Sequence, residues 1–258
     1  MCGRYASSRH PSDIVEEFEI DELRISAPLD DNYNVAPTDE VYAVVERPPR
    51  RDEEQPPDRV ERQLRAVRWG LVPSWSKDRS SGARMINARM ETVAEKPAYR
   101  QAFRKRRALV PADGYYEWYE TRRRNAQGKP AKQPYFIRPR DGGLLAMAGL
   151  YEIWRDPAKA DDDPTRFKWT MTVITTTAAD ELGQIHDRMP LMLPRAAYDT
   201  WLDPAQDDAE SLLGLLEPAA PGRLLAQPVS ALVSNVANNG PELVAPVALT
   251  DDGGALGA

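Results

Sequence analysis

Residues 108–119 read ALVPADGYYEWY. The apolar start of this stretch, 108–111, and its aromatic end, 115–119, are both typical of short β-strands. The Asp113-Gly114 pair between them is typical of a turn. More strand-like segments follow, separated by Gly, Pro and charged residues, at 135–138, 144–154 and 168–176. This series of short strands predicts one α+β domain built on largely antiparallel strands.

The remaining segments fit the same domain. A helix is expected at 11–18, because the Pro-Ser-Asp start can cap free N–H groups of the first turn. The stretch 94–106 has Tyr99 and Phe103 four residues apart, which favours a second helix with a basic outer face. The other expected elements are strands at 41–46, 64–69 and 225–233 and short helices at 178–185 and 196–202.

Two segments are expected to lie outside the packed core. Residues 46–60 are rich in proline and charge, which favours an exposed loop. Residues 249–258 include DDGGALGA and are expected to form a disordered tail. The domain is therefore expected to cover residues 1–248.

The composition is that of a globular protein. Hydrophobic residues make up 41% of the 258-residue chain, enough to supply a core. No apolar run approaches the roughly 20 residues needed to span a bilayer. The polar N-terminus lacks the apolar stretch of a secretory signal. We therefore expect a cytoplasmic protein with no membrane partner.

The charge distribution limits how the protein could bind nucleic acid. A net charge of -6 argues against a protein that coats nucleic acid over its whole surface. A local basic groove remains open, because basic residues are concentrated in the middle of the chain. They are Arg100, Arg104, Lys105, Arg106, Arg107, Arg122, Arg123 and Arg124.

The metal-binding residue types are scarce. Cys2 is the only cysteine, and His10 and His186 are the only histidines. Neither an internal disulfide nor a Cys/His zinc cage can be built from this set. We expect no metal and no cofactor, and a monomer is the default expectation.

The position of Cys2 suggests a specific chemistry. Methionine aminopeptidases generally remove Met1 before a small residue, which would leave an N-terminal 1,2-aminothiol. An α-amine has a pKa of about 7.7 to 8.0, so roughly a tenth or more is a neutral nucleophile near neutral pH. Such an amine attacks an aldehyde to form an imine, and the thiol can then close a five-membered thiazolidine ring. The alternatives are a thiolate nucleophile for acyl transfer and a small buried side chain.

Residues 85–92 alternate apolar and polar side chains. In a strand, Asn87, Arg89 and Glu91 would share one face. Asn87 could then orient a reacting group, and Arg89 could hold an anionic oxygen with its planar guanidinium. The alternative is a solvated edge strand.

Glu117 and His186 are candidates for proton transfer. Glu117 lies among four aromatic residues, and burial there would raise its pKa so that it could act as general acid and then base. The alternative is an exposed carboxylate on a strand. His186 lies at the end of a short expected helix, where loops often carry catalytic groups, although a structural histidine is the commoner case.

Two tryptophans, Trp69 and Trp75, flank a turn. Their rings could stack on unpaired bases, with Arg68 and Lys77 available to phosphates. The alternative is core packing, which we expect of at least one of the pair.

Taken together, these motifs resemble the SRAP family, named for SOS response-associated peptidase, whose members process abasic sites in single-stranded DNA. The motifs occur in family order and cover nearly the whole chain. They are MCGR at 1–4, NYNVAPT at 32–38, RWGLVPSW at 68–75, INAR at 86–89, PADGYYEW at 111–118, MAGLYE at 147–152, HDRMP at 186–190 and the segment 228–247.

The resemblance implies a set of catalytic residues and a fold. The catalytic residues would be Cys2, exposed by loss of Met1, together with Asn87, Glu117 and His186. The fold would be a compact α+β domain with a barrel-like, largely antiparallel sheet, short helices and a basic channel across one face.

The resemblance also implies a DNA-binding surface. Arg4 and Arg89 match family positions that contact DNA phosphates, and Trp75 falls in the loop that borders the DNA. We add Trp69 as a further candidate because it lies in the same motif.

The expected function is covalent capture of the abasic-site aldehyde in single-stranded DNA through Cys2, by a thiazolidine crosslink that shields the lesion. Strand cleavage by β-elimination is a possible side activity of the imine. Binding to damaged DNA would place the protein at the nucleoid. The alternatives are a cysteine peptidase that uses Cys2 and His186, with self-removal of Met1 included, and a non-catalytic single-strand binding module.

Overall fold

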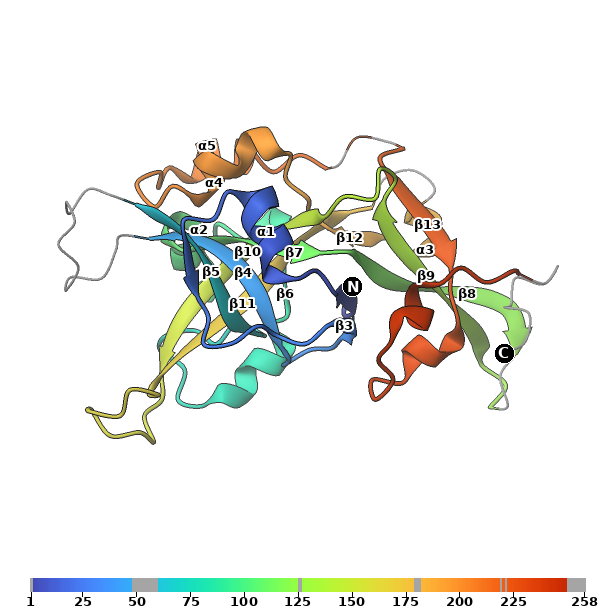
Figure 1. The fold of residues 1–258 in the computed structure, drawn as a ribbon, viewed down its shortest axis with the longest axis horizontal. Helices are drawn as coiled ribbons and strands as arrows, with labels where there is room; N and C mark the ends of the chain where they lie inside the picture. The colour runs from blue at the N-terminus through green and yellow to red at the C-terminus, as the bar shows by residue number, and fades with distance from the viewer. Residues whose placement is uncertain are drawn as a thin grey trace.

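The computed structural model describes residues 2–47, 60–124, 127–178, 182–218, 220 and 222–249. Two β-sheets dominate it (Figure 1). The smaller sheet has five strands in the order β13 (Leu224–Pro228), β9 (Pro130–Pro139), β8 (Gly114–Arg124), β1 (Tyr5–Ser7) and β3 (Asn32–Val35). Its strands pair antiparallel, with Tyr5 opposite Tyr115 and Glu117 opposite Tyr135.

The larger sheet has eight strands and curls into a partial barrel. Its order is β12 (Arg188–Pro190), β11 (Phe167–Thr177), β10 (Leu145–Arg155), β7 (Arg107–Ala112), β4 (Glu40–Arg47), β5 (Glu61–Trp69) and β2 (Glu22–Arg24), with β6 (Asn87–Arg89) beside β11. A parallel pairing of β11 with β5 closes a ring of five strands. The expected α+β class with a barrel-like, largely antiparallel sheet is confirmed.

Short helices pack around the sheets, with α4 and α5 lying along one side of the barrel (Figure 1). The helix expected at 11–18 is confirmed, and the His10 ring caps it by accepting from the Ser12 N–H. The helix expected at 94–106 is shorter, because Pro97 disfavours helical backbone in the residue before it. The helices are α1 (Pro11–Phe18), α2 (Arg100–Lys105), α3 (Leu182–Ile185), α4 (Tyr198–Leu202) and α5 (Ala209–Gly214).

Two other expected elements are also shorter than predicted. The alternating stretch 85–92 is a strand only over Asn87–Arg89, and a 3-10 turn, Met90–Thr92, follows it. Glu91 therefore leaves the face of Asn87 and Arg89 and forms an ion pair with Arg188. The strand expected at 225–233 ends at Pro228, after which Ser230 caps a 3-10 turn.

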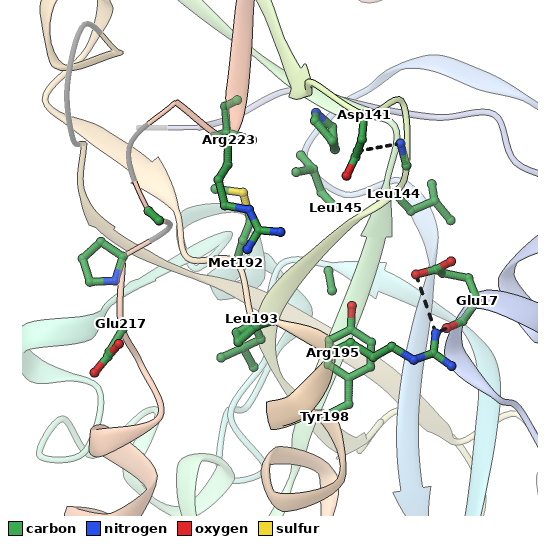
Figure 2. A pocket seen from close by; sticks show the side chains of 17 residues that line it. Glu17, Asp141, Leu144, Leu145, Met192, Leu193, Arg195, Tyr198, Glu217 and Arg223 are labelled. Carbon is green, nitrogen blue, oxygen red and sulfur yellow. Dashed lines mark hydrogen bonds and ion pairs between the residues drawn. The ribbon is translucent and has the colours of Figure 1, made fainter.

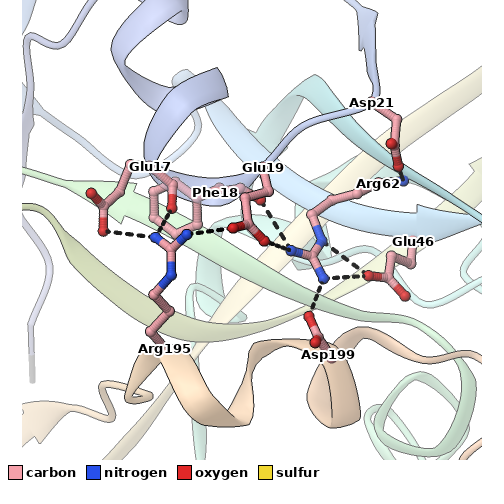
Figure 3. A network of polar contacts seen from close by, with 8 residues as sticks. All are labelled: Glu17, Phe18, Glu19, Asp21, Glu46, Arg62, Arg195 and Asp199. Carbon is pink, nitrogen blue, oxygen red and sulfur yellow. Dashed lines mark hydrogen bonds and ion pairs between the residues drawn. The ribbon is translucent and has the colours of Figure 1, made fainter.

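A polar network fastens α1 and α4 to the barrel (Figure 3). Arg62 on β5 donates to the Glu46 carboxylate on β4 at 2.7 and 3.0 Å, to the Phe18 carbonyl at 3.1 Å and to Asp199 on α4 at 2.5 Å. Burial and the Arg62 contacts pull the pKa of Glu46 in opposite directions, and burial prevails and raises it. One guanidinium thus joins four elements.

Arg107, one of the basic residues considered for nucleic-acid contact, is instead part of the core. Its buried guanidinium donates to the main-chain carbonyls of Phe103, Arg104, Trp201, Asp203 and Gln206. Carbonyls at the ends of short helices lack intrahelical partners, and the Arg107 guanidinium donates the hydrogen bonds that these carbonyls would otherwise lack.

The two segments expected outside the core fall largely beyond the described residues. Glu46 and Arg47 complete β4, but residues 48–59 of the expected loop and 250–258 of the expected tail lie outside the described part of the chain. None of the described helices is long and apolar enough to cross a bilayer.

Candidate active site at Cys2

Cys2 lies just before β1, at the seam between the two sheets. Only 2% of its surface is exposed, and it packs in one buried cluster with Tyr5 and Tyr115. β1 is held by β3 on one side and β8 on the other. On the other side of β8, Gly114 permits the close approach of β9, because a Cβ would lie 2.5 Å from the Phe136 ring.

Asn87 holds the main chain of Cys2. The side-chain Nδ2 of Asn87 donates to the Cys2 carbonyl at 2.7 Å, and the main-chain carbonyl of Asn87 accepts from the Tyr99 hydroxyl at 3.3 Å. Asn87 comes from the larger sheet through the parallel pairing of β6 with β11, whereas Cys2 leads into the smaller sheet. The hydrogen bond therefore spans the seam.

Glu117 lies two residues beyond Tyr115 on β8 and is 4% exposed. Burial raises the pKa of Glu117 to about 7, with the charge of Asp187 adding to the effect and the chain's N-terminal charge opposing it. A carboxyl group with this pKa can both donate and accept a proton at neutral pH.

His186 follows α3, which packs against β8. Its side chain is 29% exposed, and Nδ1 accepts from the Arg188 N–H at 3.0 Å. The neutral ring then carries its proton on Nε2. Burial and the N-terminal charge lower the pKa of His186, while Asp187 opposes the shift.

The four expected catalytic residues thus lie around the chain's N-terminus. Their catalytic roles stay predictions, but their grouping is a feature of the structure. Cys2 contacts Asn87 directly. Burial raises the pKa of the Cys2 thiol above its usual range, and the charge of Glu117 adds to that effect. Asp187 connects the histidine segment to Glu117 electrostatically.

Four buried polar atoms in this region have no hydrogen-bond partner among the described residues. They are Asn87 Oδ1, Glu117 Oε1 and the hydroxyls of Tyr5 and Tyr115. Buried polar atoms are nearly always paired, so a cluster of unpaired ones is a candidate site for a ligand or a reacting group. Sequence reasoning missed both tyrosines, whose common face depends on the β1–β8 register.

Arg4 lies beside the same strand and contacts residues from distant parts of the chain. Its Nη1 donates to Asn34 Oδ1 at 2.7 Å and to the Val233 carbonyl at 3.1 Å, and its guanidinium lies 5.8 Å from the Trp118 ring. The Trp118 indole donates to Ser234 Oγ at 3.0 Å. Trp118 and Asn34 were not singled out from the sequence, although both lie in the motifs that carry the resemblance.

The two tryptophans of the 68–75 motif differ completely in their exposure to solvent. Trp75 is 70% exposed. Trp69 is fully buried, packs edge-on against Tyr5 and donates to the Ile86 carbonyl. The expectation that Trp69 contacts DNA is therefore wrong, because its ring has no free face to stack on a base. Arg89 is exposed and, within the described residues, pairs with no carboxylate.

A separate pocket of about 530 Å³ lies beside α4 (Figure 2). Met192 and Leu193 contribute apolar surface, and an ion pair between Glu17 and Arg195 lies at one side. None of its lining residues belongs to the Cys2 site. No group of three or more potential metal ligands occurs in the described parts of the chain.

Comparisons with known proteins agree with this geometry. The family model of SOS response associated peptidase (SRAP) matches residues 1–236. The abasic site processing protein YoqW of Bacillus subtilis is 36% identical over 244 residues, which cover 95% of this chain and 99% of that protein. The abasic site processing protein HMCES of Xenopus tropicalis is 34% identical over 219 residues, which cover 76% of this chain and 61% of that protein.

Solved structures share the fold. A protein from Bacteroides thetaiotaomicron superposes with a TM-score of 0.74 at 24% identity, covering 96% of this chain and all of that one. A phage-related protein from Bordetella bronchiseptica superposes with a TM-score of 0.61 at 28% identity, covering 88% of this chain and 94% of that one. With the family model matched over most of its length, the chain belongs to the SRAP family.

Proposed function

We propose that this protein processes abasic sites in single-stranded DNA by capturing their aldehyde covalently through Cys2. One observation carries the proposal. Asn87 donates a hydrogen bond to the Cys2 carbonyl, and two buried acceptors in the same site, Asn87 Oδ1 and Glu117 Oε1, have no partner among the described residues. An amine freed at Cys2 by loss of Met1 would supply the donors that these two acceptors lack.

The first step opens the sugar and forms the imine. Glu117, with its pKa of about 7, protonates the ring oxygen as the hemiacetal opens to the aldehyde. The neutral Cys2 amine then attacks C1', and the carbinolamine loses water with His186 moving a proton. The hydrogen bond from Asn87 fixes the attacking residue, so proximity replaces a second-order encounter.

The second step closes the ring. The thiol adds across the C=N bond, so that sulfur joins C1' and nitrogen keeps one proton as a secondary amine. The thiazolidine contains every atom of the imine and the thiol. Before closure, the imine can instead undergo β-elimination, which would give strand cleavage as a side activity.

Three side chains of the described chain suit contact with a single DNA strand. Arg89 and Arg4 offer charge to phosphates, and the exposed ring of Trp75 offers a stacking face. The Trp118 ring, 5.8 Å from the Arg4 guanidinium, offers a second aromatic surface beside that arginine. With a net charge of -6, the attraction must come from this local patch.

The buried surroundings of the Cys2 thiol weigh against a cysteine peptidase as the main activity. A peptidase needs the thiolate of Cys2. Burial and the neighbouring Glu117 charge raise the pKa of the thiol, which keeps it protonated. An amine that attacks first, followed by a thiol, fits this environment better.

Intact mass spectrometry tests the proposal. The purified protein is incubated with a single-stranded oligonucleotide carrying one abasic site and then heated. We expect a starting mass without Met1 and a heat-stable one-to-one adduct mapped to Cys2. A tetrahydrofuran analogue, which cannot open to an aldehyde, should bind without an adduct. Loss of Met1 with no adduct on the true abasic site would overturn the capture reaction.

Cys2→Ser separates the two functional groups. The variant keeps the amine but can form only an oxazolidine, which hydrolyses readily. We expect an adduct from this variant only when borohydride reduces the imine. A heat-stable adduct without borohydride would count against ring closure by sulfur.

A further inference from the structure

The hydroxyls of Tyr5 and Tyr115 are buried polar groups that the capture reaction described above does not use. Each residue is 1% exposed, and neither hydroxyl has a partner among the described residues. The residues are directly opposite each other in the β1–β8 ladder, so both side chains leave the sheet on the same face. That face carries Cys2 in the same buried cluster.

Both hydroxyls lie within electrostatic range of the Cys2 sulfur. Burial is the largest cause that raises the pKa of Tyr5 and of Tyr115, and negative charge on Cys2 is the second largest. The two phenols are therefore neutral O–H donors. Among the described residues, the thiol donates only to the Arg4 carbonyl, at 3.7 Å.

We propose that Tyr5 and Tyr115 act as a pair of hydrogen-bond donors to the Cys2 sulfur while it loses its proton and closes the thiazolidine ring. The inference rests on the proposed capture reaction and assigns its second step. The thiol stays protonated in this buried site, so ring closure needs stabilisation of charge that develops only on sulfur as the proton leaves. Two preoriented O–H dipoles supply that stabilisation.

The step balances. The sulfur–C1' bond forms as the π electron pair of the protonated C=N bond moves onto nitrogen. The thiol proton goes to the Glu117 carboxylate. The iminium charge and the carboxylate charge disappear together, and the tyrosines keep their protons throughout.

The arrangement also explains why the structure tolerates unpaired hydroxyls in its core. A buried donor without a partner destabilises the folded state. Replacing either tyrosine by phenylalanine keeps the ring and removes that penalty. The same substitution should therefore make the protein more stable and slower at ring closure, a combination that a purely structural role does not produce.

The experiment follows the two adducts separately. Tyr5→Phe, Tyr115→Phe and the double variant are mixed with the abasic oligonucleotide in single turnover. Borohydride added at intervals traps the imine, and heating without borohydride reveals the thiazolidine. We expect imine formation within about twofold of the parent, and ring closure slowed about tenfold in each single variant and about a hundredfold in the double variant. Melting temperatures should rise by about 2 °C or more.

Tyr151→Phe is the matched control. It removes a hydroxyl from the same buried cluster, but its ring stacks on Trp169, and its electrostatic neighbours are three arginines and Glu152 rather than Cys2. Ring closure at the parental rate in the double Tyr5/Tyr115 variant would overturn the inference. An equal loss of imine and thiazolidine would also overturn it, because the hydroxyls would then act before ring closure. Failure of the parent protein to form either adduct would instead reject the capture reaction.

Discussion

The side-chain amide of Asn87 donates to the main-chain carbonyl of Cys2 across 2.7 Å and thereby joins a strand of the barrel to the start of the chain. The contact fixes the residue whose amine is proposed to react, and it leaves Asn87 Oδ1 buried without a hydrogen-bond partner among the described residues. A single residue therefore sets both the position and the surroundings of the proposed nucleophile.

Asn87→Ala should slow capture without weakening DNA binding. The Cys2 main chain would lose its anchor, and imperfect alignment alone can lower a rate about a hundredfold. We expect that loss in the single-turnover crosslinking rate, with the dissociation constant for undamaged single strands within about twofold of the parent. Gln206→Ala removes a partly buried amide just before α5, outside the Cys2 site, and should change neither quantity. Crosslinking at the parental rate in Asn87→Ala would remove Asn87 from the mechanism.

Glu117→Gln should remove one limb of the pH profile. With a pKa of about 7, Glu117 is protonated and able to open the sugar below neutral pH, and it loses that proton as the pH rises. Deprotonation of the amine acts in the opposite direction, so the parent should show a maximum near neutral pH. The variant should be about 100-fold or more slower, and the fall above pH 7 should disappear. The measurement is the crosslinking rate from pH 5 to pH 9.

The same carboxyl group should also affect stability. Its pKa is raised from 4.5 in the unfolded chain to about 7 in the folded protein, so the folded state holds the proton more tightly. Stability from this group is present below pH 4.5 and is lost as the pH rises to about 7, by up to about 3 kcal/mol. Glu117→Gln should therefore exceed the parent in free energy of unfolding at pH 8 more than at pH 4.5. Urea denaturation at both values checks the sign.

The two tryptophans of one motif should give opposite results. Trp75→Ala should weaken single-strand binding by about 1–3 kcal/mol, because the exposed ring offers a stacking face, and should leave stability within about 0.5 kcal/mol. Trp69→Ala should destabilise the fold by about 3–5 kcal/mol. Fluorescence anisotropy and thermal denaturation on both variants distinguish a binding residue from a core residue. Equal binding by Trp75→Ala and the parent would place the strand elsewhere.

Two arginines form another contrasting pair. Arg89 is exposed, and Arg89→Ala should reduce the slope of log affinity against log salt by about 0.7, as expected for one lost phosphate contact to a single strand. Arg107→Met should leave that slope unchanged. It should instead lower the free energy of unfolding by at least about 3 kcal/mol, because five carbonyls lose their buried donor.

Much of the fold was predictable because its strands are local patterns. The runs at 108–111, 115–119 and 168–176 lie within observed strands, and the run at 144–154 does so except for its first residue, because alternation and turn residues act over short distances. The pairing of β1 with both β3 and β8 was not predictable, since it joins Tyr5 to Val35 on one side and to Tyr115, more than a hundred positions away, on the other. Long-range register depends on packing that no local pattern encodes.

The candidate site likewise has features that were predictable from the sequence and features that were not. Cys2, Asn87, Glu117 and His186 were identified by residue type and family motif. Their grouping, and the two unpaired tyrosine hydroxyls, depend on the three-dimensional structure. Trp69 and Trp75 belong to one motif, and tertiary packing separates the buried ring from the exposed one. Arg107 shows the same limit, because a basic run does not reveal which of its members turns inward.

The seam between the sheets gives the site an unusual sensitivity. Cys2, Glu117, Tyr5 and Tyr115 belong to the smaller sheet, whereas Asn87 belongs to the larger one. The edge-on contact of Tyr5 with Trp69, at 5.1 Å between ring centres, is part of what keeps the two sheets aligned. A slight sliding of one sheet along the other would separate nucleophile from anchor while both sheets stayed folded. Activity should thus be lost on heating before either sheet melts, and crosslinking should serve as a more sensitive gauge of sheet alignment than any spectroscopic measure of unfolding.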